Sequence, residues 1–111
     1  MPGNKTDAVL WKIAKELVEG SEAQNRLVAV HGIVRTEKLI EVYIVYKKDL
    51  DVVENERNGI SDALKGRFLQ GMLLSGHSLA ADDEVAFHFD SQETVDRDFQ
   101  GSYIHFLGLF Y

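Results

Sequence analysis

The stretch RLVAVHGIVRTEKLIEVYIVYKK, residues 26–48, decides the fold of this chain of 111 residues. It is rich in β-branched and aromatic side chains, which fit the pleated surface of a sheet. We therefore predict two strands, Leu27–Val34 and Leu39–Lys47, joined as a hairpin by residues 35–38. A connection this short requires the two strands to run antiparallel.

The predicted hairpin is apolar on both of its faces. The four-residue connection pairs Val34 with Leu39, His31 with Val42, and Ala29 with Ile44. Glu41 is the charged member of one face, whereas a hairpin at the surface of a protein alternates more cleanly between apolar and polar residues. We expect either that both faces are covered within the domain or that one face is covered by another chain.

Helical periodicity flanks the hairpin on both sides. Before the hairpin, an apolar stripe predicts a helix over about Thr6–Glu19, ended by Gly20. After the hairpin, a second apolar stripe predicts a helix from Ile60 to Leu73. The polar segment between the hairpin and this second helix, residues 47–59, is interpreted as a turn-like connection that closes with Asn58 and Gly59.

The C-terminal part of the chain is expected to complete the sheet. Alternation over Val85–Phe89 predicts a strand, and Asp90 or Ser91 is a candidate cap for a short helix after it. Residues 102–111 fit a strand or a helix, and their aromatic content favours a strand. The expected fold is a single α+β domain spanning residues 1–111. It has a mostly antiparallel sheet, made of the hairpin and one or two C-terminal strands, packed against two main helices.

The net charge of −6 is unevenly distributed along the chain. Residues 1–48 carry eight basic and six acidic side chains, or +2, and residues 49–111 carry four basic and twelve acidic side chains, or −8. This balance argues against direct binding of nucleic acid, because phosphate contacts require Lys and Arg. It suits a basic protein partner.

The amino-acid composition also limits the cellular compartment and the kinds of chemical site that we expect. The absence of cysteine excludes disulfides, cysteine zinc sites and cysteine nucleophiles. No stretch has the length and apolar character of a membrane span, and charged residues interrupt the N-terminal segment, so we expect a cytoplasmic protein without a signal peptide. We expect no cofactor and no metal site, because no known phosphate-binding, calcium or metal motif is present.

One acid–base cluster can be constructed from the predicted strands. His31 and His88 could meet if their strands were neighbours, and Asp90 lies two residues from His88 on the same face. Histidine is versatile enough to serve as an acid, a base or a ligand there. Isolated histidines in strands are more often structural, so we predict no catalytic residues and keep a small ligand-binding protein or enzyme as an alternative.

Acidic residues of the second half gather around the predicted C-terminal strand and helix. The first group is Asp82, Asp83 and Glu84, and the second is Asp90, Glu93, Asp96 and Asp98. Carboxylates of this kind pair bidentately with Arg and can imitate phosphate. Phe99 and Tyr103 stand next to the second group and would supply an apolar centre for a contact. These nine residues form the predicted partner-binding site.

The segment FDSQETVDRDFQGSYIHFLG, residues 89–108, looks like the tail of small bacterial orphan proteins. Over the whole chain, an acidic, cysteine-free α+β protein that begins with a helix and a hairpin resembles the small immunity proteins of bacterial toxin–immunity systems. The resemblance is to those of contact-dependent growth inhibition. It implies tight binding of a cognate toxin domain, for example a nuclease, in the cytoplasm. The alternative from another class is a module that self-associates, as a homodimer, through the two-sided apolar hairpin.

Overall fold

The structure is a computed structural model that describes residues 5–36, 38–75 and 84–108. The predicted residues Asp82 and Asp83 and the last three residues lie outside this part of the chain. The described elements follow one another as α1 (Lys5–Asn25), β1 (Leu27–Thr36), β2 (Leu39–Tyr46), α2 (Asp49–Arg57), α3 (Ile60–Leu74), β3 (Glu84–Ser91), α4 (Gln92–Phe99) and α5 (Tyr103–Phe106).

The predicted α+β class is confirmed, whereas the sheet, expected to be mostly antiparallel, is mixed. The strand order is β1-β2-β3, with β1 antiparallel to β2 and β3 parallel to β2. The parallel pair arises because α2 and α3 lie between β2 and β3 in the sequence. They carry the chain back to the end of the sheet at which β2 begins. β2 is therefore the central strand, and β1 and β3 form the two edges.

The register of the hairpin differs by one residue from the prediction. Thr36 is the partner of Leu39, and Val34 pairs with Ile40. β1 continues two residues beyond the predicted end, so the connection is shorter than four residues, and a bulge follows Val34. This shift pairs His31 with Tyr43 in place of the predicted Val42. Because the side chains of a strand alternate between faces, a shift of one residue also changes which residues share a face.

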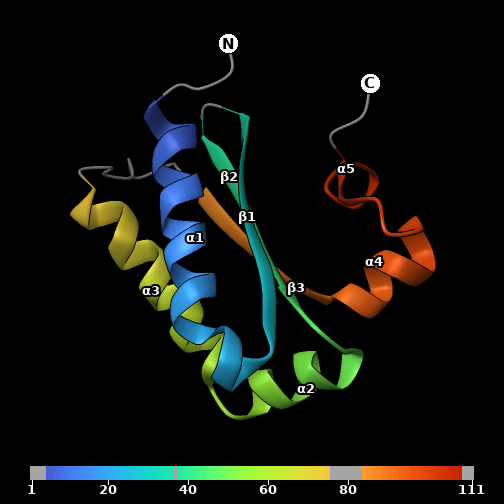
Figure 1. The fold of residues 1–111 in the computed structure, drawn as a ribbon. Helices are drawn as coiled ribbons and strands as arrows, with labels where there is room; N and C mark the ends of the chain where they lie inside the picture. The colour runs from blue at the N-terminus through green and yellow to red at the C-terminus, as the bar shows by residue number, and fades with distance from the viewer. Residues whose placement is uncertain (1–4, 37, 76–83, 109–111) are drawn as a thin grey trace.

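One face of the sheet packs against α1 and α3, which are the two main helices of the prediction (Figure 1). The buried core comprises Leu10, Ile13, Ala14 and Leu17 of α1, Leu27 and Val30 of β1, Ile40, Val42, Ile44 and Tyr46 of β2, and Leu64, Phe68 and Met72 of α3. Gly32 allows the close approach of α1, since a Cβ atom there would lie 3.1 Å from the Leu10 Cβ. We call the opposite face of the sheet the outer face.

The outer face is partly covered within the chain, by the C-terminal helices. Figure 1 shows α4 and α5 on the side of the sheet away from α1 and α3. Ala29, His31 and Ile33 of β1 remain half-buried there. We expected the second apolar face of the hairpin to be covered either within the domain or by another chain. Part of it is thus covered within the same chain.

Residues 47–59 were predicted as a turn, and this prediction was wrong because the segment contains helix α2. The buried residues of this helix are the polar Asp51 and Asn55, so apolar periodicity did not reveal it. Its termini carry the charges that favour a helix, since acidic side chains occupy the first turn and Arg57 the last. The Asp51 carboxylate accepts a hydrogen bond from the Lys48 N–H at 3.0 Å, which satisfies a backbone donor at the start of α2.

The end of the first helix also differs from the prediction. α1 continues through Gly20 to Asn25, and the chain turns at Arg26, whose φ is 57°. The left-handed conformation of Arg26 is held by its ion pair with Asp51 at 3.2 Å and by the Lys47 N–H, which donates to the Arg26 carbonyl at 2.9 Å. Of the two predicted caps, Asp90 and Ser91, it is Ser91 that begins α4, because its hydroxyl accepts the Thr94 N–H.

The preference for a strand over residues 102–111 was wrong for the described part of that segment. Tyr103–Phe106 forms the short helix α5, which Ser102 caps through its hydroxyl. Gln100 and Gly101 have φ of 54° and 78°, so the chain reverses between α4 and α5 and does not extend as a strand. Among the described residues, no helix combines the length and the apolar character needed to cross a bilayer.

Candidate functional site

A row of three rings crosses the outer face, one from each strand. His31 of β1 pairs with Tyr43 of β2, and Tyr43 pairs with His88 of β3. The Tyr43 and His88 rings stack with centroids 4.7 Å apart and planes 22° apart. The predicted meeting of His31 and His88 therefore does not occur, because β2 lies between their strands.

Arg35, Glu41, Tyr43 and His88 form a hydrogen-bonded group that we call the outer-face cluster. The Arg35 guanidinium donates through Nε to the Glu41 carboxylate and through Nη2 to the Tyr43 hydroxyl at 3.2 Å. The second Glu41 oxygen lies 3.0 Å from His88 Nε2. The Arg35 hydrogen bond, followed by that of His88, holds the pKa of Glu41 below its ordinary value, against the opposing effect of burial.

The outer-face cluster anchors the C-terminal helix. Arg35 Nη2 donates to the Leu107 carbonyl, just beyond α5. The Phe106 ring meets Tyr43 edge-on at 5.5 Å, and the Tyr103 ring lies 5.1 Å from His31. Burial lowers the pKa of His31, whose Nε2 is enclosed and has no hydrogen-bond partner among the described residues. The neutral imidazole therefore serves as a packing surface for α5.

Replacing Glu41 with glutamine is expected to lower the free energy of unfolding by about 1–2 kcal/mol at pH 7, the size of a lost hydrogen bond to a charged group. Since the folded-state pKa of Glu41 is depressed below 4.5, the carboxylate stabilises the fold above that pH. Its contribution is lost as the pH falls through the folded-state pKa. Urea unfolding of both proteins between pH 3 and 7 should show the difference shrinking at the acid end.

The control for this substitution is Glu56→Gln, which removes an exposed carboxylate of α2. The control should follow the wild type across the pH range. A difference between Glu41→Gln and the wild type that stays constant down to pH 3 would contradict the linkage between Glu41 ionisation and folding.

The acid–base alternative loses its third member in the structure. Asp90 accepts a hydrogen bond from the Ser91 N–H at 2.8 Å, and the carboxylate that meets His88 is Glu41. Glu41 was recognised in the sequence only as a charged residue on an apolar face. Within residues 5–36, 38–75 and 84–108, no group of three or more histidine or acidic side chains is placed to hold a metal ion.

The predicted acidic site is divided between two ends of β3. Glu84 is exposed at the start of the strand, about 20 Å from Asp90 at the usual rise of ~3.3 Å per residue. Asp90 and the three acidic residues of α4 lie together at the other end. The structure thus brings together the second predicted group, with Phe99 and Tyr103, and separates Glu84 from it.

Glu93 and Asp49 link α4 to the start of α2. The Glu93 carboxylate accepts the Asp49 N–H at 2.8 Å, and the Asp49 carboxylate accepts the hydroxyls of Ser91 and Thr94. The Ser91 hydroxyl, followed by Arg97, lowers the pKa of Asp49. Glu93 therefore has a structural role in addition to its predicted one.

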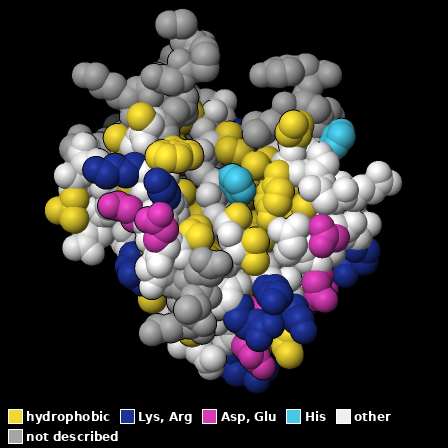
Figure 2. Space-filling model, viewed as in Figure 1, with side chains coloured by type: hydrophobic (Ala, Val, Ile, Leu, Met, Phe, Trp, Pro, Cys, Tyr) yellow, Lys and Arg dark blue, Asp and Glu magenta, His cyan; other side chains and the backbone are white. Residues whose placement is uncertain are grey.

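Asp96 and Asp98 are two further exposed carboxylates of α4. Asp96 accepts a hydrogen bond from the Gln92 side chain at 3.0 Å, and Asp98 pairs with Arg97 at 3.2 Å. Arg97 also reaches Asp49 at 3.2 Å, so one basic residue stands among the acidic ones. Figure 2 shows acidic side chains beside basic ones in the α4 region and hydrophobic side chains gathered between α1 and α5.

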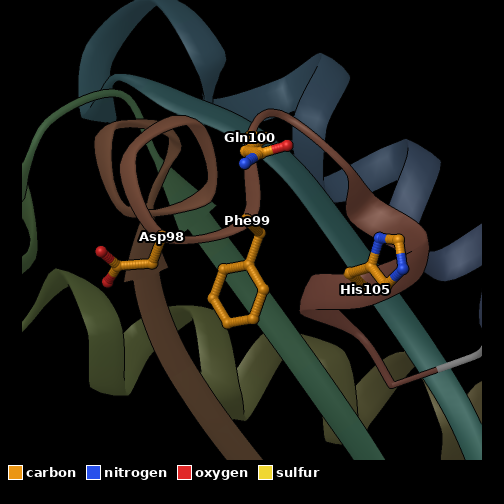
Figure 3. Close-up of a pocket in the computed structure, with 4 residues that line it drawn as sticks. All are labelled: Asp98, Phe99, Gln100 and His105. Atoms are coloured by element: carbon orange, nitrogen blue, oxygen red, sulfur yellow. The ribbon is translucent and has the colours of Figure 1, made fainter.

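An open hollow lies where α4 turns into α5. Its volume is about 350 Å³, and it is lined by Asp98, Phe99, Gln100 and His105 (Figure 3). The Phe99 ring lies between Asp98 and His105 in this view. The left-handed Gln100 and Gly101 form the turn that brings His105 back toward the end of α4.

Tyr103, a residue of the predicted site, mainly connects α5 to α4. Its hydroxyl donates to the Gln92 side-chain carbonyl, and burial, followed by the nearby Asp96 charge, raises its pKa. Sequence reasoning missed Asp49, Gln100 and His105. Asp49 had a usable signal as an acidic residue at a helix start, whereas Gln100 and His105 became neighbours only through the turn between α4 and α5.

Comparisons with protein-family models, with curated proteins and with solved structures found no match to this chain.

Proposed function

We propose that this protein is a protein-binding inhibitor, of the kind that gives immunity to a cognate toxin in the bacterial cytoplasm. The observation that carries the proposal is the exposure of Asp96 and Asp98 on α4 beside the hollow at Phe99. Protein interfaces combine an apolar centre with a polar rim, and complementary charge raises the encounter rate. A toxin with a basic substrate channel, such as a nuclease, has the matching charge.

The α4 surface offers a stable platform for such a contact. Its helix is capped by Ser91 and connected to α2 through the hydrogen bond from the Asp49 N–H to Glu93. Phe99 is supported from behind by Phe106, whose ring it meets edge-on at 5.5 Å. Because little rearrangement is needed on binding, the entropy cost of ordering this surface is small.

The test is a toxin protection assay with charge reversal. A candidate toxin domain, chosen from the genes that flank this one, is expressed with the wild-type chain or with the double variant Asp96→Lys/Asp98→Lys. We expect the wild type to restore growth, and the double variant to bind the toxin about 10–100-fold more weakly, with a smaller dependence on salt. Circular dichroism establishes that the double variant is folded.

The matched control is Asp62→Lys, a charge reversal at an exposed acid in the first turn of α3. It should protect as well as the wild type. Equal protection by the double variant and the wild type, or equal loss in the control, would rule out the α4 surface as the binding site.

We propose self-association through β1 as a second candidate function. β1 is an edge strand with no charged side chain from Leu27 to Val34, and Val28 is 38% exposed. Unprotected edge strands are templates for pairing with another chain. A molecular mass that rises with concentration in size-exclusion chromatography with light scattering would favour this candidate, and a constant monomer mass would exclude it.

A further inference from the structure

We propose that the hollow between α4 and α5 is a socket for one arginine side chain of the protein partner. The inference rests on the proposed function, since it assigns to the partner the group that enters this site. At about 350 Å³ the hollow is at the lower end of the range for ligand pockets, which suits a single long side chain better than a cofactor.

Phe99 supplies the surface on which a guanidinium group can stack. The ring is half-buried, and its edge-on contact with Phe106, at an interplanar angle of 77°, fixes its orientation. A planar cation over an aromatic face is attracted by the electrons of the ring. Figure 3 shows the Phe99 ring between Asp98 and His105, with the Asp98 carboxylate directed away from the ring in this view.

Asp98 supplies the charge that an arginine requires. Its side chain is 52% exposed, and its Oδ1 atom accepts the hydrogen bond from Arg97. Adjacent helical residues do not face each other well, so the Arg97 contact is a weak competitor for an incoming guanidinium. The Oδ2 atom makes no hydrogen bond to the described residues, and a carboxylate can receive two parallel N–H donors from a guanidinium.

The surroundings favour a cation over an anion and arginine over lysine. α4 carries Glu93, Asp96 and Asp98 against Arg97 alone, so its net charge is −2 from three acidic residues and one basic residue. Stacking on Phe99 together with forked hydrogen bonding to Asp98 requires a flat group with several donors. Arginine has this shape, whereas the lysine ammonium is a compact, strongly hydrated charge.

The experiment is a titration of the ¹⁵N-labelled full chain with N-acetyl-L-arginine amide, followed by NMR. We expect saturable shifts of the backbone amides of residues 98–105, with a dissociation constant on the order of 1–10 mM for a fragment of this size. N-acetyl-L-lysine amide should bind at least about fivefold more weakly, because it cannot both stack and fork. The norleucine analogue, which lacks the charge, should leave these amides unshifted.

Two variants and a matched control assign the site. Asp98→Asn keeps the shape but removes the charge, and Phe99→Leu keeps an apolar side chain but removes the ring. Each should weaken binding of the arginine probe about 5–10-fold. Asp62→Asn, which removes a distant exposed carboxylate of α3, should bind the probe as the wild type does.

The socket is overturned if the arginine probe gives no saturable shift at residues 98–105, if lysine binds equally well, or if Asp98→Asn binds like the wild type. These outcomes are separable from the fate of the proposed function. If the toxin is neutralised in a way that depends on Asp96 and Asp98 while the probe fails, only the socket is wrong. If the probe binds as expected but toxin protection is unchanged by the charge reversals, the socket is supported and the proposed function is wrong.

Discussion

Replacing Phe68 with alanine is expected to lower the free energy of unfolding by about 3–5 kcal/mol. Phe68 is fully buried in α3, and its ring meets Phe87 of β3 edge-on at 6.0 Å. The same ring reaches β1, because its Cζ atom would lie 3.4 Å from a Cβ added at Gly32. One side chain thus joins α3 to both edges of the sheet, and its removal leaves a cavity that close-packed neighbours cannot fill.

Denaturant unfolding followed by circular dichroism measures this effect, with Leu74→Ala as the control. Leu74 belongs to the same helix but is 81% exposed, so its truncation should change the free energy of unfolding by no more than about 0.5 kcal/mol. A loss below about 1 kcal/mol for Phe68→Ala would mean that α3 does not pack on the sheet as described.

Replacing Arg35 with methionine is expected to loosen α5 selectively. The guanidinium joins Glu41, Tyr43 and the Leu107 carbonyl, so its removal breaks the polar link between the sheet and the C-terminal helix. The Glu41 carboxylate would keep its contact with His88 and the hydrogen bond that it accepts from the Tyr43 hydroxyl at 3.4 Å. We expect a loss of about 1–3 kcal/mol in global stability, given hydrogen bonds to a charged group and a partly exposed Arg35 side chain.

Hydrogen exchange separates the local effect from the global one. The Phe106 and Leu107 amides donate to the Ser102 and Tyr103 carbonyls, and their protection should fall by about tenfold or more beyond the loss in β2. Arg97→Met, which removes exposed ion pairs of α4, is the control and should leave the α5 amides protected. Uniform loss of protection over β2 and α5 in Arg35→Met would show that Arg35 supports the sheet alone.

Arg35 also bears on the candidate site. The socket residue His105 belongs to α5, while Asp98 and Phe99 belong to the end of α4. The position of α5 depends on Arg35, a residue of β1 that is far from the hollow in the sequence. Arg35→Met should therefore weaken the arginine probe as well, through the displacement of His105.

Local sequence patterns were sufficient to predict the elements that have strong apolar periodicity. The alternation of apolar residues in β3 and the helical stripes of α1 and α3 each reflect burial on one face, which is written directly into the order of residues. The two candidate caps, Asp90 and Ser91, also marked the start of α4 to within one residue, because capping depends on neighbours within three residues. The α+β class followed from the order of these elements.

Patterns were insufficient where burial is weak or where the chain turns. Asp51 and Asn55, both polar, are the buried residues of α2, so no apolar stripe marks it. The hairpin register depended on a bulge after Val34, which adds one residue to one strand without changing composition. The direction of α5 depended on the left-handed backbone conformation of Gln100, which few non-glycine residues adopt.

By itself, the sequence determined the charge of the second half, the two main helices, the three strands and the grouping of Asp90, Glu93, Asp96 and Asp98, which are neighbours along the chain. Only the tertiary structure decided that Glu41, and not Asp90, meets His88, and that His105 lies beside Phe99 and Asp98. The physical reason is distance along the chain. Contacts within a few residues follow from backbone geometry, whereas contacts across strands and turns follow from packing, register and bulges that no local pattern encodes.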